Sequence, residues 1–362
     1  MTTFIASAPG KVILLGEHGV NRRQPALATA VDMRARCRAQ TRTDGSYTFS
    51  SGDYFERGGS ERLVQFKAEI DEFRASDQLD LLRERTRADF FAPARYALAH
   101  VIGECREAPG MDLEWHSELP VGSGLGSGAA ATAAMLLAAA EVLGIEMEPA
   151  DIAHFAWQGD IVAHGGVASG LDSGACVLGG ITCYNLADGP RRLPCDVTLP
   201  LLTCDTLVRA HTGDINTRVR KGLDAHPARA RLFSEMGFLV EHAQEALVDA
   251  DLPALGHLLN LNQLLLEKLG VSSAEIERLV EAALEAGALG AKLSGSGGGG
   301  VVIALANPGH EREVADAMEA AGGRSIVAAA NAPGVRLEDG EVWGPLYRRG
   351  GSLPTSALKA KH

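Results

Sequence analysis

A loop rich in glycine and serine, residues 120–130, is the part of this chain whose residue types indicate chemistry most directly. It reads P-V-G-S-G-L-G-S-G-A-A and runs straight into an alanine- and leucine-rich stretch that is typical of a helix. Glycines let the backbone approach an anion closely, and the free N–H groups and dipole of a helix start attract negative charge. Two more glycine-bearing segments occur at 8–18 and 292–300. Three such segments in one chain predict an enzyme that handles a nucleoside triphosphate.

Two common nucleotide-binding patterns do not fit these segments. A P-loop needs a glycine followed by Lys-Ser or Lys-Thr, whereas Lys11 is followed by Val12. Gly295, Gly297 and Gly300 have the spacing of the dinucleotide fingerprint, but that fingerprint must open a helix. The residues that follow Gly300 read V-V-I-A-L, which is typical of a strand. The triphosphate is therefore expected to be bound by a different kind of glycine loop.

Size and charge narrow the class of protein further. The chain has 362 residues, 46% of them hydrophobic, which is enough for two domains with cores of their own. The net charge of -12 argues against non-specific binding to nucleic acid or to acidic membranes. An acidic enzyme that binds an anionic substrate needs local cations, so single Lys and Arg residues near the loops become candidates for function.

The cysteines and the N-terminus predict a reduced, cytoplasmic location. None of the six cysteines forms a C-x-x-C pair, and no Cys/His cluster has zinc spacing. The N-terminus lacks the apolar core of a signal peptide. The most apolar stretch, 129–140, is too short for a bilayer, which takes about 20 residues. We therefore expect a soluble protein with a small-molecule substrate and without a membrane or nucleic-acid partner; a homodimer is compatible with the sequence.

The hydrophobic pattern predicts alternating strands and helices that position the three glycine segments. Two short strands, 4–7 and 11–15, are expected around a Pro9-Gly10 turn, and one helix over 62–85. The segment 167–178 is expected to be a loop that turns into a strand, and 188–194 is the best candidate for a linker. Further helices are expected at 90–105, 129–143, 149–164, 227–250, 252–269, 273–286 and 311–321, and further strands at 111–117, 181–184, 206–211, 291–293, 301–306 and 324–330.

Three motifs in a fixed order carry a family resemblance. They are A-P-G-K-V-I-L-L-G-E-H at 8–18, P-V-G-S-G-L-G-S-G-A-A at 120–130, and K-L-S-G-S-G-G-G-G at 292–300. In this order and at these separations they resemble the small-molecule kinases of the GHMP superfamily, which includes galactokinase, homoserine kinase, mevalonate kinase and phosphomevalonate kinase. One glycine loop alone would be weak evidence, but three in order are specific. The resemblance covers residues 4–338.

The resemblance implies a fold and a domain organisation. The fold is α/β plus α+β, with an N-terminal domain like ribosomal protein S5 that binds ATP and carries catalysis, residues 1–190. A ferredoxin-like C-terminal domain would span 191–338, followed by a tail, 339–362. The flanking residues are most similar to mevalonate kinases: the first motif ends in Gly16-Glu17-His18, and 157–172 read W-Q-G-D-I-V-A-H-G-G-V-A-S-G-L-D. This resemblance implies phosphorylation of the 5-hydroxyl of mevalonate, a step of isoprenoid precursor synthesis.

The resemblance assigns the central chemistry to Asp172 and Lys11. Phosphoryl transfer needs a group that accepts or orients the proton of the attacking hydroxyl, and a cation that stabilises charge on the transferred group. Asp172 matches the catalytic aspartate of the family, and Lys11 matches the lysine beside it. Without the resemblance, Asp172 in its small-residue loop would read as a turn residue that caps its own backbone. The ATP-binding residues expected in the loop are Pro120, Gly122, Ser123, Gly124, Leu125, Gly126, Ser127, Gly128 and Ala129.

The cofactors implied are ATP and Mg²⁺. Asp160 stands where relatives have a glutamate that binds magnesium, and a carboxylate of either length suits this ion. The glycine loop departs from the family at one place, because relatives have two successive serines where this chain has Ser127-Gly128. Ser127 is the expected second magnesium ligand, with Ser123 or water as the alternative. This departure also favours a weakly catalytic, ligand-sensing relative as a rival interpretation.

The sequence specifies the binding site of the acceptor less closely than the ATP site. The resemblance puts the substrate near the end of the first motif, the loop before Asp172, the Asn216-Thr217-Arg218 segment and the third glycine segment. Phosphomevalonate, the 3-hydroxyl of mevalonate and a sugar stay open as alternative acceptors. A phosphorylated acceptor would need extra cations near Glu17, and Arg22, Arg23, Arg218 and Lys221 are available. The expected substrate-binding residues are Glu17, His18, Ser169, Gly170, Thr217, Gly295, Ser296 and Gly297.

Overall fold

Two β-sheets organise the chain, which is described here by a computed structural model for residues 2–103, 109–120, 122–195, 197–209 and 212–339. The larger sheet has the order β12-β1-β2-β5-β3-β4, with β6 paired to the other half of β2 and β7 paired to β6. All neighbours are antiparallel except β3 and β5. Its strands are β1 (Thr3–Leu15), β2 (Ala26–Arg42), β3 (Ser46–Ser51), β4 (Tyr54–Gly59), β5 (Gly110–Ser117), β6 (Ile181–Asn185), β7 (Gly189–Arg192) and β12 (Arg336–Glu338).

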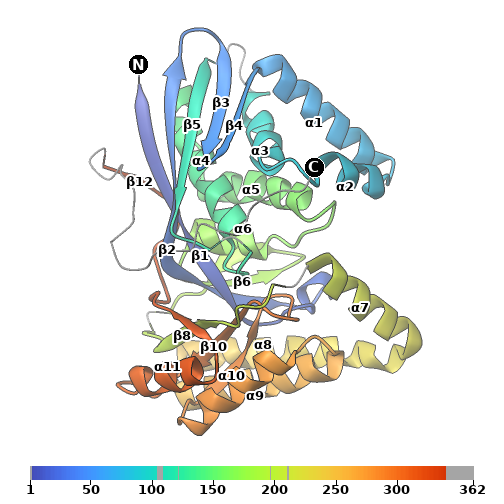
Figure 1. Ribbon diagram of the computed structural model, residues 1–362, viewed down its shortest axis with the longest axis vertical. Coiled ribbons are helices and arrows are strands. Elements are labelled where there is room, and N and C mark those ends of the chain that lie inside the picture. The colour runs from blue at the N-terminus through green and yellow to red at the C-terminus, as the bar shows by residue number, and fades with distance from the viewer. Residues whose placement is uncertain (1, 104–108, 121, 196, 210–211, 340–362) are drawn as a thin grey trace.

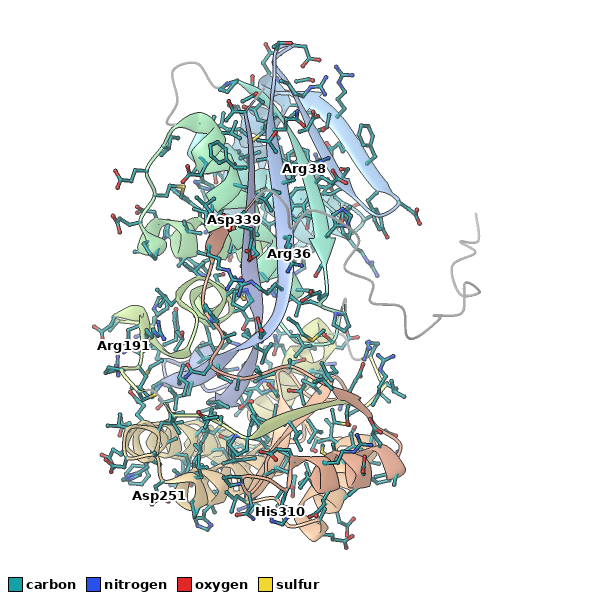
Figure 2. All side chains as sticks on the ribbon, turned by 90° about the vertical axis from the view of Figure 1, so that its left-hand side faces the viewer. Arg36, Arg38, Arg191, Asp251, His310 and Asp339 are labelled. Carbon is teal, nitrogen blue, oxygen red and sulfur yellow. The ribbon has the colours of Figure 1, made fainter. Side chains whose placement is uncertain are left out.

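Helices cover one face of this sheet (Figure 1). Ala35, Cys37 and Ala39 are fully buried, while the intervening Arg36 and Arg38 lie on the other face, where both are seen in Figure 2. This alternation is the period of two that a sheet with one covered face imposes. The helices of this half are α1 (Ser60–Ala75), α2 (Leu79–Thr86), α3 (Ala92–Ile102), α4 (Ser127–Leu143), α5 (Pro149–Ala163) and α6 (Leu171–Leu178), and a short 3₁₀ turn spans Val20–Arg22.

The smaller sheet lies at the other end of the molecule (Figure 1). Its order is β11-β8-β10-β9, all antiparallel, and every residue of the central β10 is buried. Its strands are β8 (Leu201–Asp205), β9 (Gly290–Ser294), β10 (Val301–Leu305) and β11 (Arg324–Ile326). Its helices are α7 (Thr212–Ala225), α8 (Arg231–Val248), α9 (Leu252–Leu269), α10 (Ala274–Glu285) and α11 (Glu311–Ala320), with a 3₁₀ turn at Pro227–Ala230. None of the helices in the described ranges combines the length and the apolarity that a bilayer span requires.

The chain returns to the larger sheet at its end. The last strand, β12, pairs antiparallel with β1, so the two sheets are joined twice. Arg34 holds the returning segment: it is buried and donates hydrogen bonds to the carbonyl oxygens of Pro333 (2.8 Å) and Gly334 (2.7 Å) and to the Ser7 hydroxyl (2.7 Å). Burial lowers the pKa of Arg34 to about 10. Of the tail that begins at 339, only Asp339 lies within the described residues.

The segment from Leu171 onward is a helix, which corrects the prediction that the loop turns into a strand here. Residues 171–178 form α6, because the small side chains of this stretch allow a helix to pack closely against β7. A Cβ on Gly174 would lie only 2.2 Å from Cβ of Pro190. Close tertiary packing has outweighed the strand propensity of Val177 and its neighbours. Asp172 therefore stands in the first turn of a helix, where the helix dipole favours a negative charge.

Other element predictions were also wrong in detail. The stretch 188–194 is not a free linker, because β7 in it pairs with β6. The helix expected over 62–85 is two helices, which a left-handed Asp77 (φ 56°) separates. The strand expected at 206–211 lies earlier, as β8, and residues 210–211 are outside the described residues. The two strands expected at the start are one strand, β1, with a register shift between Pro9 and Gly10, since proline cannot donate to the ladder.

Candidate active site

The loop between β5 and α4 has the geometry of an anion site. Gly122, Gly124 and Gly126 all have positive φ, at 73°, 84° and 73°, a region that residues with a Cβ rarely enter. Gly126 is the N-cap of α4, and half-buried Ser127 is the first residue of that helix. The first N–H groups of α4 therefore stand free at a turn built for close approach of a ligand. We call residues 120 and 122–128 the phosphate loop.

Lys11 joins the phosphate loop to Asp172. Its backbone N–H donates to the carbonyl of Leu125 (2.9 Å), and its ammonium donates to the carbonyl of Gly124 (3.1 Å). The same ammonium lies 3.0 Å from Oδ1 of Asp172. A Cβ on Gly126 would come within 3.0 Å of Cγ of Lys11, so this glycine also makes room for the lysine stem. The cation is thereby held between the loop and the carboxylate.

The two partners of this ion pair differ in exposure. The side chain of Lys11 is 3% exposed, whereas that of Asp172 is 31% exposed. A buried lysine is fixed in place, while the carboxylate keeps one side open to an incoming group. The pair can therefore bind the proton of an attacking hydroxyl at Asp172 and stabilise negative charge through Lys11.

Asp160 on α5 lies behind this pair and is almost fully buried. The Ser173 hydroxyl donates a hydrogen bond to its Oδ2. Burial, and then the negative charge of Asp172, raise the pKa of Asp160 to about 7, against the opposing effects of Ser173 and Lys11. A cation beside Asp160 would stabilise its charged form.

The donors present fit a magnesium ion that is shared with a nucleotide. Mg²⁺ in kinase sites is usually bound by one or two carboxylates together with phosphate oxygens and water. Asp160 supplies one such carboxylate, and the hydroxyl of Ser127 stands at the start of α4. Within the described ranges no three His, Cys, Asp or Glu side chains gather into a metal cluster. One carboxylate and one hydroxyl on the protein suit an ion that is bound together with phosphate oxygens.

The third glycine segment packs behind the phosphate loop. The Ser294 hydroxyl accepts a hydrogen bond from the N–H of Ile13 on β1 (2.8 Å). A Cβ on Gly124 would lie 3.7 Å from the carbonyl oxygen of Ser294, and one on Gly300 would lie 3.6 Å from that of Ser123. These contacts place the third glycine segment beside the phosphate loop.

Glu17 is buried in a polar network rather than exposed to a pocket. Its side chain is 1% exposed and forms an ion pair with Lys292, which is fully buried. Asn262 on α9 donates to the second carboxylate oxygen of Glu17 (3.2 Å). Both oxygens thus have protein partners. This network ties the first motif to the third and to α9, a positioning role that sequence reasoning did not foresee.

The other predicted substrate residues lie at several places around these motifs. His18 is buried with φ 59°, and its Nε2 lies 3.0 Å from the carbonyl oxygen of Ser296. Burial lowers the pKa of His18, so the imidazole is neutral near pH 7. Gly170 is the N-cap of α6, directly after half-buried Ser169. Thr217 is half-buried on α7.

The glycines of the third segment differ in the room around them. A Cβ on Gly297 would lie 2.2 Å from the carbonyl oxygen of Val271, so this position requires glycine. Gly295 has φ +105° and open space around it. Of the two, Gly295 is the position that a ligand could approach.

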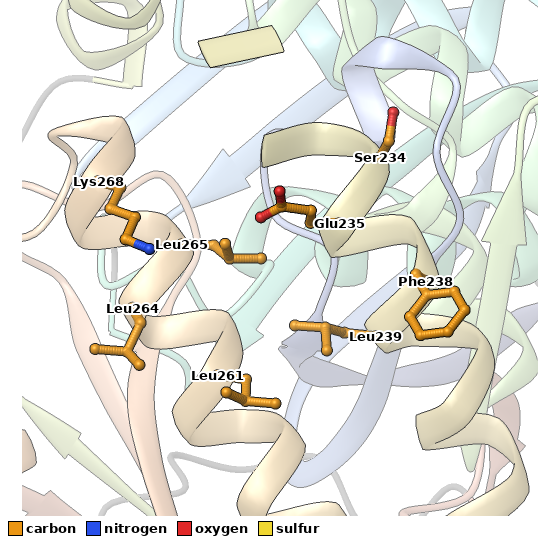
Figure 3. A pocket seen from close by; sticks show the side chains of 8 residues that line it. All are labelled: Ser234, Glu235, Phe238, Leu239, Leu261, Leu264, Leu265 and Lys268. Atoms are coloured by element: carbon orange, nitrogen blue, oxygen red, sulfur yellow. The ribbon is translucent and has the colours of Figure 1, made fainter. Parts of the chain in front are cut away.

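Sequence reasoning missed Ser173 and Asn262 as members of the site. Ser173 had a local signal, since it follows Asp172 directly and now bonds to Asp160. Asn262 had none, because its contact with Glu17 spans 245 residues. An apolar groove of about 550 Å³ between α8 and α9 is separate from the residues named above (Figure 3). It is lined by Ser234, Glu235, Phe238, Leu239, Leu261, Leu264, Leu265 and Lys268.

Comparison with protein families and with known proteins agrees with this geometry. The family model described as the GHMP kinases N terminal domain matches residues 92–180, and the one described as GHMP kinases C terminal matches 243–324. A mevalonate kinase from Pyrococcus horikoshii is 35% identical over 345 residues, which cover 92% of this chain and 98% of that protein.

Solved structures share the fold at lower identity. A mevalonate kinase from L. major, solved in complex with R-mevalonate, aligns with a TM-score of 0.71 and 24% identity over 92% of this chain and 96% of that one. A galactokinase from Lactococcus lactis, solved with galactose, aligns with a TM-score of 0.73 and 16% identity over 92% and 95%. Since kinases of different acceptors fit this fold equally well, the fold alone does not select the acceptor.

Proposed function

The chain belongs to the GHMP kinases, ATP-dependent phosphotransferases, and on that premise we propose that it transfers the γ-phosphoryl group of ATP to the 5-hydroxyl of mevalonate. The acceptor rests on the identity with mevalonate kinases over nearly their whole length. The single structural observation that carries the reaction is Lys11, whose ammonium lies 3.0 Å from Asp172 and 3.1 Å from the Gly124 carbonyl of the phosphate loop.

In the proposed reaction Asp172 accepts the proton of the attacking hydroxyl. The O–H bond of the acceptor breaks, its proton moves to the open side of the carboxylate, and the oxygen forms a bond to the γ-phosphorus. The bond from that phosphorus to the β–γ bridging oxygen breaks, and ADP leaves. Lys11 stabilises the negative charge that spreads over the transferred group. Free N–H groups at the start of α4 bind the phosphates that remain with ADP.

We further propose that Asp160 and Ser127 hold a magnesium ion that is bound together with ATP. The ion supplies charge neutralisation for the triphosphate. The burial of Asp160 and its raised pKa of about 7 support this role. A nearby cation would stabilise the charged form of the buried carboxylate. Relatives are expected to have their second serine where this chain has Gly128. Ser127 is the hydroxyl nearest to that position in the sequence.

We propose that the acceptor binds on the side of the site where the first and third motifs meet. Mevalonate carries a carboxylate and hydroxyl groups, which suit a neutral imidazole, small hydroxyl side chains and backbone N–H groups. His18, Ser169 and Thr217 supply the side chains, and Gly170 with residues 295–297 supplies backbone. Glu17 acts through Lys292 and Asn262 and shapes this surface without touching the acceptor.

A panel of acceptors tests the proposal. ADP release is measured with mevalonate, phosphomevalonate, galactose and homoserine at equal concentrations, with ATP and Mg²⁺ in excess. We expect turnover with mevalonate to exceed that with every other acceptor by at least about a hundredfold, since specific hydrogen bonds to hydroxyl groups discriminate this strongly. Faster turnover with phosphomevalonate, or turnover with none of the four, would contradict the proposal.

A further inference from the structure

The phosphate loop has no positively charged side chain of its own. Residues 120–130 contain no Lys or Arg, and the chain as a whole carries a net charge of -12. A triphosphate brings several negative charges, and charge-assisted hydrogen bonds from cations are the strong contacts to phosphate. Lys11 is already paired with Asp172. A cation from a different segment would therefore add a charge-assisted contact to those that the proposed magnesium ion and Lys11 make with the triphosphate.

Arg209 follows β8 and lies against the start of the phosphate loop. Its Cδ lies 3.9 Å from the position that a Cβ on Gly122 would take. The backbone of the segment before it is fixed to the third glycine motif, because the N–H of Thr206 donates to the carbonyl of Gly300 (2.9 Å) and the N–H of Gly300 donates to the carbonyl of Val208 (2.9 Å). The backbone just before Arg209 is thus fixed to the third glycine segment, and the Arg209 side chain lies near Gly122 of the phosphate loop.

Asp205, a buried acid at the end of β8, fixes the guanidinium group of Arg209. Asp205 is fully buried and accepts hydrogen bonds from both terminal nitrogens of Arg209, at 2.7 and 2.8 Å. Two parallel bonds of this kind set the plane of a guanidinium. Burial by itself would raise the pKa of Asp205, but hydrogen bonds from Arg209 and from the N–H of Leu207 lower it overall. Asp205 is therefore ionised and holds the guanidinium of Arg209 in a fixed orientation.

Asp205 is paired with more positive charge than its own single negative charge neutralises. Arg324 on β11 also reaches Asp205, at 3.1 Å, so two guanidinium groups share one carboxylate. The side chain of Arg209 is 42% exposed, and that of Arg324 is 52% exposed. One guanidinium would have been enough to satisfy the buried acid. These three side chains together carry one net positive charge, and Arg209 is the member that lies at the edge of the phosphate loop.

We propose that Arg209 is a nucleotide-binding residue that donates hydrogen bonds to a phosphate oxygen of ATP, with Asp205 as the residue that positions it. The inference rests on the proposed function in that it takes the loop to be a triphosphate site. The plain alternative is that Arg209 only neutralises Asp205 and ties the end of β8 in place. Arg324 separates the two, because it shares the buried acid and has no such contact with Gly122 among those described.

Matched variants test the proposal. R209M and R324M each remove one guanidinium from Asp205, and R209K keeps the charge without the paired geometry. For R209M we expect the KM for ATP and the Kd for ADP, measured by calorimetry, to rise about tenfold or more, since losing a charge-assisted hydrogen bond weakens binding by this order. The KM for mevalonate should stay within about twofold. R324M should leave all three within about twofold, and R209K should fall between.

The outcomes separate this inference from the proposed function. Equal losses of nucleotide affinity in R209M and R324M, or none in R209M, would overturn the role of Arg209 while wild-type phosphorylation of mevalonate still stands. If the wild type phosphorylates no acceptor in the panel but loses ADP affinity in R209M alone, the acceptor is wrong and Arg209 is retained. Should R209M fail to fold by circular dichroism, R209K decides, because an unchanged Kd for ADP in that variant also overturns the proposal.

Discussion

The ammonium of Lys11 lies 3.0 Å from the carboxylate of Asp172, and the two residues are brought together from the first strand and the sixth helix. The lysine is buried and the carboxylate is partly open. The arrangement allows Asp172 to meet a substrate without losing its cation. It also connects the acceptor side of the site to the phosphate loop, because the same ammonium bonds to Gly124.

Asp172→Asn should therefore remove most of the turnover and leave the fold intact. The amide keeps the shape of the carboxylate but can no longer accept the proton of the hydroxyl. General bases contribute typically about 10²–10⁴-fold, so kcat should fall by that order while ADP binding stays within a few fold. The check is steady-state kinetics alongside calorimetry with ADP. Turnover near that of the wild type would remove Asp172 from the catalytic role.

Gly128→Ser should be tolerated and should lower the requirement for ATP or Mg²⁺. No heavy atom lies within 4 Å of the position that a Cβ on Gly128 would take, and its φ is not positive. A serine here restores a hydroxyl in the first turn of α4, where small polar residues are favourable. The measurement is a titration of ATP and of Mg²⁺ against turnover.

Gly126→Ser is the matched control for that substitution. Gly126 has φ +73°, and a Cβ there would meet the stem of Lys11 at 3.0 Å, so this serine should strain the loop and reduce activity. A Gly128→Ser variant that folds but needs more ATP and more Mg²⁺ would show that the glycine itself is required. Equal behaviour of the two serine variants would contradict the loop geometry.

Much of the site could be predicted from sequence because its motifs are local. Three parts of the site are each contiguous in the sequence: Lys11 with its flanking Pro-Gly, the phosphate loop with its helix, and the third glycine segment. Residue type and order were therefore enough to pick out these segments. Asp172 was assigned a role, yet the helix that carries it was missed. A run of small and apolar residues does not distinguish strand from helix, and packing against Pro190 decides it.

What sequence could not supply are the contacts between distant segments. Glu17 was expected at the substrate, since its position beside His18 gives no sign of burial. Its partners Lys292 and Asn262 are far away in the chain, and only the fold shows that they occupy both carboxylate oxygens. Arg209 and Asp205 were missed for the same reason, because the neighbouring phosphate loop is more than 75 residues earlier in the chain.

Lys292→Met should destabilise the protein strongly. The side chain is fully buried against Glu17, and removing one partner of a buried ion pair costs about 3–5 kcal/mol because the other charge is left without compensation. Glu17→Gln should cost a similar amount, and the double variant should cost much less than the sum. Denaturant unfolding of the three variants checks this. Additive losses would mean that the two residues act independently and would argue for a separate role of Glu17 at the substrate.

Asp160 should make the stability of the metal-free protein depend on pH. Its pKa is about 7 in the folded protein against an ordinary 3.8, so between these values the folded state keeps a proton that the unfolded state has lost. Stability must then fall as pH rises through this window, by at most about 4 kcal/mol for three pKa units. The free energy of unfolding relative to Asp160→Asn should therefore decline from about pH 4 to pH 7 and be constant above.

Magnesium ions with ADP should restore that loss above pH 7 in the wild type and not in Asp160→Asn. Unfolding curves in the presence and absence of both ligands provide the comparison. Parallel pH profiles for the two proteins would mean that Asp160 does not titrate in this range. An unchanged Mg²⁺ titration of turnover in Asp160→Ala would further show that this carboxylate is not a ligand.

Phosphorus NMR of the product shows directly which oxygen of mevalonate receives the phosphate. Mevalonate is incubated with ATP, Mg²⁺ and the protein, and the product is compared with the reaction of Asp172→Asn. We predict one new phosphomonoester signal whose coupling to two protons identifies the CH₂ group that carries the 5-hydroxyl, formed together with an equal amount of ADP. A phosphate without that coupling, as on the 3-hydroxyl, or ADP released without a phosphorylated product, would contradict transfer to the 5-hydroxyl.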